Sequence, residues 1–144
     1  MRSVARLVSI GALAGGFLLG WFAHAGVVDA QTRKPIMMTR IYTGSDGLSH
    51  SEQVEMKLTP QGTSTMKASS IEFSSRPAAP VSDWHTGPRR QFVITLSGRA
   101  ELEVANGQKV PIGPGNINLI EDTTGKGHTT HNIEDRIVAT IPLE

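Results

Sequence analysis

The chain has 144 residues, no cysteine and a formal net charge of +1 at pH 7. The lack of cysteine excludes a disulfide framework and thiolate chemistry, and scattered charges of both signs argue against a nucleic-acid partner. The length suits one modest domain that relies on its hydrophobic core for stability.

The first thirty residues have the pattern of an export signal. A basic start is followed by residues 7–28, which contain no Asp, Glu, Lys or Arg, and residues 23–25 form a small-x-small cleavage site. The alternative is an uncleaved apolar helix, because 22 residues are enough to span a membrane. Both interpretations place a domain of residues 31–144 outside the cytoplasm: periplasmic, secreted or anchored to the membrane. We favour cleavage.

Residues 31–144 show the pattern of an all-β domain. Gly and Pro separate short runs rich in β-branched residues, and residues 54–58 and 100–104 alternate with the period of a half-buried strand. Asn106-Gly107 predicts a tight hairpin. A single helical turn at residues 51–57 is an alternative left open. The predicted strands are 37–43, 54–58, 65–73, 91–96, 100–104, 109–112, 117–120 and 137–141. Many short strands with frequent turns indicate a sandwich or barrel.

One string, DWHTGPRRQFVITLSG at residues 83–98, carries the most specific motif. It resembles the first motif of the cupin superfamily, which has His-x-His, then Glu three or four residues later, and Gly seven residues after that Glu. Here Gly98 matches the final Gly and His85 the first His. Gln91 stands at the Glu position and Gly87 at the second His position, so two usual ligands are replaced.

The second cupin motif is similar to PGN at residues 114–116, with its His delayed to His128 in EDTTGKGH at 121–128. The resemblance covers residues 41–142. It implies a cupin-type double-stranded β-helix, a jelly-roll barrel that commonly forms homodimers. It implies no single activity, because cupins include enzymes and metal-free binding proteins.

On this resemblance, the candidate metal ligands are His85, Gln91 and His128. Imidazole suits Fe, Mn, Ni, Cu or Zn, whereas a neutral amide oxygen is a weaker donor, and the set lacks the carboxylate of ordinary non-haem iron sites. We expect His128 to be presented by a flexible loop at residues 123–127. The competing interpretation is that His85 and His128 line a metal-free pocket.

The candidate substrate-binding residues are Trp84, Arg89, Arg90 and His131. A guanidinium fork matches a carboxylate or a phosphate, which favours an anionic ligand. The structural alternative is that the arginines pair with Glu121 or Asp122, and we favour it for at least one of them. For Trp84 we favour a place in the core over one on the floor of the pocket. His50 is expected in a solvent-facing loop.

Three functions are compatible with these residues. The first is a metal-dependent cupin enzyme of oxygenase, isomerase or lyase type, acting on a small polar or anionic molecule. The second is a metal-free binding or sensing cupin. The third is a metal-free isomerase or lyase that uses His85 or His128 as general base. No catalytic residue is assigned.

Overall fold

Nine strands and no helix make up residues 34–144, the part of the chain that the computed structural model describes. In chain order they are β1 (Met37–Thr43), β2 (Ser49–Glu55), β3 (Glu72–Arg76), β4 (Gln91–Ser97), β5 (Ala100–Val104), β6 (Lys109–Ile112), β7 (Ile117–Glu121), β8 (His128–Asn132) and β9 (Arg136–Pro142). The apolar helix, signal or anchor expected in the first thirty residues lies outside this range. Within residues 34–144, no helix is long and apolar enough to cross a bilayer.

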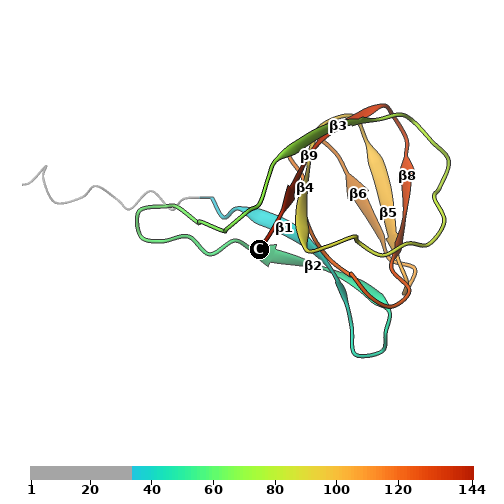
Figure 1. The fold of residues 1–144 in the computed structure, drawn as a ribbon, viewed down its shortest axis with the longest axis horizontal. Helices are drawn as coiled ribbons and strands as arrows, with labels where there is room; N and C mark the ends of the chain where they lie inside the picture. Colours follow the sequence, from blue (N-terminus) through green and yellow to red (C-terminus); the bar gives the residue numbers. More distant parts are fainter. Residues whose placement is uncertain (1–33) are drawn as a thin grey trace, which may run out of the picture. The chain divides into compact units, whose positions relative to one another are not determined.

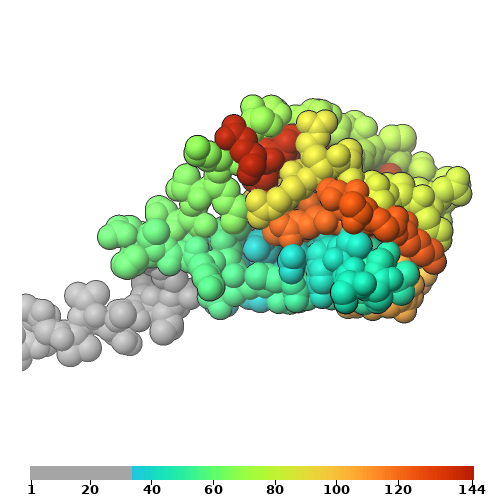
Figure 2. Space-filling model, turned by 60° about the horizontal axis from the view of Figure 1, so that its bottom comes forward, coloured from blue at the N-terminus to red at the C-terminus, as the bar shows by residue number. Residues whose placement is uncertain are grey.

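The strands form two sheets. A six-stranded sheet has the order β2-β1-β7-β4-β9-β3, and a three-stranded sheet has the order β6-β5-β8 (Figure 1). All pairs are antiparallel except β1 with β7. Figure 2 shows this parallel contact from outside, where the blue-green residues of β1 and β2 lie against the orange residues around β7. The described strands form an all-β structure of two sheets, and their pairing does not close a barrel.

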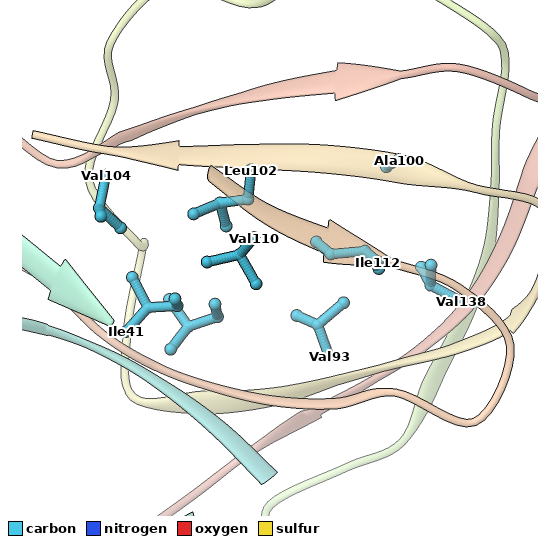
Figure 3. Close-up of a cluster of buried hydrophobic side chains, with 9 residues drawn as sticks. Ile41, Val93, Ala100, Leu102, Val104, Val110, Ile112 and Val138 are labelled. Atoms are coloured by element: carbon cyan, nitrogen blue, oxygen red, sulfur yellow. The ribbon is translucent and has the colours of Figure 1, made fainter. Parts of the chain in front are cut away.

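The main hydrophobic core lies between the sheets, as Figure 3 shows. It consists of Ile41, Val93, Ala100, Leu102, Val104, Val110, Ile112, Ile120 and Val138. Strand β5 supplies three of them because Ala100, Leu102 and Val104 alternate with the partly exposed Glu101 and Glu103. Burying a side chain such as that of Val104 contributes about 1.5–3 kcal/mol. The period of two read from this segment is therefore confirmed.

The predicted hairpin between β5 and β6 is also confirmed. Asn106 Oδ1 accepts a 2.9 Å hydrogen bond from the Gln108 amide. Gly107 has φ +83°, a conformation that glycine adopts without steric cost. The turn chemistry thus sets the register in which Leu102 faces Val110.

Three polar strands differ from the sequence prediction. Strand β2 occupies 49–55 instead of 54–58, so there is no helical turn at 51–57 and His50 lies on a strand. Strand β3 overlaps only the end of the predicted 65–73 strand. Strand β8 was not predicted, and it places His128 on a strand and not in a loop. The reason is that cross-strand pairing, such as the seven-residue register of β1 with β2, holds segments that lack an apolar period.

Residues 79–87 extend the three-stranded sheet, although they form no regular strand. Their amides donate to carbonyl oxygens of β8, Ala79 to Asn132 at 3.0 Å and Ser82 to Thr130 at 2.9 Å. We call this stretch the 79–87 segment; it lies beside β8 in Figure 1. It carries His85 to the edge of β8 and so builds one wall of the site described next.

Candidate functional site

A cavity of about 220 Å³ lies between the two sheets. Residues of the core, including Val93, Leu102 and Ile120, form its apolar part. Its charged and amide-bearing lining consists of Arg76, His85, Gln91, Asn118, His128 and Arg136. The cavity therefore joins an apolar interior to a polar wall, which is the usual make-up of a small-molecule site.

His85 and His128 are joined through their backbones. Each amide donates to the other residue's carbonyl oxygen, both at 2.9 Å. The imidazole rings lie 4.6 Å apart, centre to centre, with 59° between their planes. The spacing of the two rings is thus fixed by main-chain pairing between the 79–87 segment and β8.

The Nδ1 atom of each histidine has an acceptor. His128 Nδ1 donates to Asp122 Oδ2 at 2.6 Å, and His85 Nδ1 donates to the Asp83 carbonyl oxygen at 2.9 Å. We assign the hydrogens to Nδ1 because a carboxylate and a peptide oxygen only accept. This tautomer leaves the Nε2 lone pair of both rings free of any partner among the described residues.

Asp122 supports the site from behind His128. Its side chain is 0 % exposed, and its Oδ1 has no hydrogen-bond partner within residues 34–144. Its carbonyl oxygen accepts from the Gly87 amide at 3.0 Å. A Cβ at Gly87 would lie 2.5 Å from Ile120 Cγ2. Close packing thus explains why glycine, and not a second histidine, stands at this point of the motif.

Gln91 shares the cavity with the two histidines. It is the first residue of β4, it is buried, and it pairs with Ile120 on one side and Pro142 on the other. The structure therefore brings together all three candidate metal ligands. Within residues 34–144, however, no group of three or more His, Asp, Glu or Cys side chains is arranged to hold a metal.

The four candidate substrate-binding residues do not line the cavity. Arg89 is exposed. Trp84 is exposed as well and so does not belong to the core as expected; its ring lies against Lys126, whose Nζ is 4.0 Å from the ring centre. His131 follows His128 by three positions on β8, and alternation along a strand turns it to the opposite face. Arg90 Nε donates to Glu121 at 2.6 Å, the kind of ion pair that the sequence analysis favoured for at least one arginine.

Glu121 is held by two guanidinium groups outside the cavity. Arg40 and Arg90 both donate to its carboxylate. Burial alone would raise the pKa of Glu121, but hydrogen bonds from Arg90 and Arg40 outweigh it and hold the pKa below its usual value. The pair thus fixes the end of β7 immediately before Asp122.

Sequence reasoning missed the two arginines that do line the cavity, Arg76 and Arg136. Arg136 is only 2 % exposed, and burial followed by repulsion from Arg76 lowers its pKa to about 10. Burial also lowers the pKa of Arg76. Neither residue lies in a recognisable motif, so only the pairing of β3 with β9 could have brought them together.

Comparisons with known proteins add little to this description. No family model matches the chain, and no curated protein matches it. One solved structure that resembles it is protein NMB1881 from Neisseria meningitidis. The two are 15 % identical with a TM-score of 0.43, over 55 % of this chain and 79 % of that one. Residues 34–144 thus form an all-β unit of two sheets with a partly polar cavity between them.

Proposed function

We propose that this domain is a cupin-type jelly roll that binds a small molecule in the cavity through a divalent transition metal on His85 and His128. The supporting observation is the pair of free Nε2 atoms. Metal-binding histidines commonly donate their other ring N–H to a carboxylate or a backbone carbonyl, which fixes the ring and its tautomer. Both partners are present here, Asp122 for His128 and the Asp83 carbonyl for His85.

The ring spacing fits this proposal. Two imidazoles that bind one ion at about 2.1 Å, at an angle between a right angle and a tetrahedral one, have centres roughly 4.5–5.2 Å apart. The observed separation of 4.6 Å lies at the lower end of this range. Gln91, in the same cavity, is the candidate for a third and weaker ligand.

The charges around the cavity predict a modest affinity for a metal ion. No carboxylate lines the cavity, and Arg76 and Arg136 add positive charge to it. Only Asp122, behind His128, offsets the charge of an ion. A metal such as Zn, Cu, Ni, Mn or Fe would act there as a Lewis acid toward the bound molecule. The reaction, if one occurs, would be of oxygenase, isomerase or lyase type.

Metal analysis of the full chain, purified without chelators, tests the proposal. We expect about one transition metal per chain in the wild type and none in His85→Ala or His128→Ala. His131→Ala is the matched control, since His131 lies on β8 but outside the cavity. A wild type that carries no metal, and whose melting temperature is unchanged by added Zn, Ni, Cu, Mn or Fe salts, would contradict it.

A metal-free binding or sensing protein is the second candidate function. The observation that favours it is the composition of the cavity, in which two arginines, two imidazoles and two amides meet without a three-ligand group. Ligand binding that survives complete removal of metal would support this candidate. Export and a homodimer remain parts of our proposal that rest on the sequence.

A further inference from the structure

We infer that Arg136 and Arg76 form an anion subsite in the cavity, which takes the carboxylate of a small organic acid. The inference deepens the proposed function, since it names the class of molecule bound in the same cavity. It stands on the placement of two guanidinium groups that form no ion pair or hydrogen bond with the described side chains.

The two arginines are brought together by the register of the sheet. Arg76 ends β3 and Arg136 begins β9, and they face each other in the antiparallel pair. Both line the cavity that contains His85 and His128. Like charges directly opposite each other destabilise a sheet. The arrangement therefore destabilises the folded protein when no anion is bound.

Arg136 is buried without partners. Its Nε and Nη1 are inaccessible to solvent and donate to no hydrogen-bond acceptor within residues 34–144. Buried charges are ordinarily paired, because an unpaired one loses its hydration without compensation. Glu72, four residues before Arg76 on β3, acts on Arg76 but not on Arg136, and its influence on the Arg76 pKa is smaller than that of burial.

The surface arginines provide the contrast. Arg40 and Arg90 pair with Glu121, and Arg99 pairs with Glu134. Among residues 34–144, glutamates thus form ion pairs with surface guanidiniums, where such pairs matter little, and none forms an ion pair with Arg76 or the buried Arg136. A bound anion would provide the missing charge, and a carboxylate matches the planar fork of a guanidinium.

The cavity also limits the size of the acid. About 220 Å³ is less than the roughly 300–1,000 Å³ of sites for drug-sized ligands. The Nε2 atoms of His85 and His128 remain available for another group of the same molecule. A short acid with a second polar group therefore fits the whole cavity.

Calorimetric titration of the full chain with malonate, acetate and inorganic phosphate tests the subsite, with malonamide as the uncharged control at matched ionic strength. We expect malonate to bind and malonamide not to bind. Arg136→Met and Arg76→Met should each weaken malonate binding at least tenfold. Arg136→Lys, which keeps the charge but loses the fork, should weaken it less. Arg99→Met, a surface control, should change it less than twofold.

Melting of the unliganded variants separates binding from a structural role. Arg136→Met should melt at or above the wild-type temperature, because it removes an uncompensated buried charge. A lower melting temperature, or unchanged malonate affinity in Arg136→Met, overturns the subsite. Binding of phosphate but not malonate overturns the carboxylate assignment. Malonate binding by metal-stripped protein supports the subsite and contradicts a metal requirement for ligand binding. Retention of metal by a protein that binds none of the anions supports the metal site and contradicts the anion subsite.

Discussion

A Cβ placed on Gly127 would lie 2.0 Å from the main-chain oxygen of His85. Gly127 has φ +73°, and the amide of the next residue, His128, donates to that same oxygen at 2.9 Å. The two histidines can be joined through their backbones only because the residue between β8 and the preceding loop has no side chain.

Replacing Gly127 by alanine should therefore separate the histidines. Gly115→Ala is the matched control, since Gly115 has φ +83° but nothing within 4 Å of an added Cβ. The control should lower the free energy of unfolding by about 1 kcal/mol, the cost of a left-handed alanine. Gly127→Ala should lower it by about 3 kcal/mol, because backbone must also move. Urea denaturation measures both, and equal losses would contradict the close approach.

Removing the Asp122 side chain should destabilise the fold more than removing that of Asp46. Both aspartates bond to a histidine, but the Asp122–His128 pair is buried, whereas the Asp46–His50 pair is exposed. Asp122→Ala leaves His128 Nδ1 buried without an acceptor, which should cost about 2–3 kcal/mol. Asp122→Asn keeps an acceptor and should cost less. Chemical denaturation of the three variants measures the losses in the free energy of unfolding. A larger loss for Asp46→Ala than for Asp122→Ala would contradict the prediction.

The pairs of Glu121 should contribute stability only above acidic pH. Because the pKa of Glu121 is lower in the folded chain than its usual value near 4.5, its contribution is complete above that value and is lost as the pH falls through the folded pKa. Glu121→Gln should lower the free energy of unfolding by up to about 1 kcal/mol at pH 7. The loss is small because Arg90 is half exposed and solvent screens the pair.

Unfolding free energies of wild type and Glu121→Gln, measured from pH 7 to pH 3, should therefore converge at the acidic end. Glu134→Gln, which alters the exposed pair with Arg99, is the control and should differ little from wild type at pH 7. A constant difference across the range would mean that charge on Glu121 is not the cause.

The charge of Arg136 should weaken the fold at neutral pH. Its pKa is lowered to about 10 in the folded chain, so the destabilisation from its charge is complete below pH 10 and diminishes as the pH rises above that value. Arg76 lies opposite, and Glu72 acts on Arg76 from the same strand. Arg136→Met should raise the free energy of unfolding by about 1–3 kcal/mol at pH 7. Denaturation at pH 7 and above pH 10 checks this, and a gain that grows with pH would contradict it.

The strands that the sequence predicted well are those with one apolar face against the core. The bounds of β1, β5 and β6 match the predicted 37–43, 100–104 and 109–112. Strands β2 and β8, with the sequences SHSEQVE and HTTHN, lack such a face. They are held by pairing with β1 and β5. Pairing partners distant in the chain leave no periodic signal in a segment, which is why these strands were misplaced or missed.

The candidate site was only partly predictable for a related reason. His85, Gln91 and His128 were found because they occupy positions of a recognisable motif, and they do line one cavity. Arg136 follows Glu134 and Asp135, a run of charges typical of a solvated turn. Its burial depends on β9 beginning at that residue and on β3 lying opposite. Arg89 and Arg90, which stand within the motif, lie instead on the surface.

The main-chain link between His85 and His128 separates two properties that most cavities combine. The spacing of the imidazoles depends on peptide groups, whereas the shape and charge of the cavity depend on side chains such as Val93, Ile112 and Arg76. Substitutions at those positions can change the shape and charge of the cavity while the two imidazoles keep their separation. The scaffold is therefore suited to divergence, in nature or by engineering, toward different ligands around one constant centre.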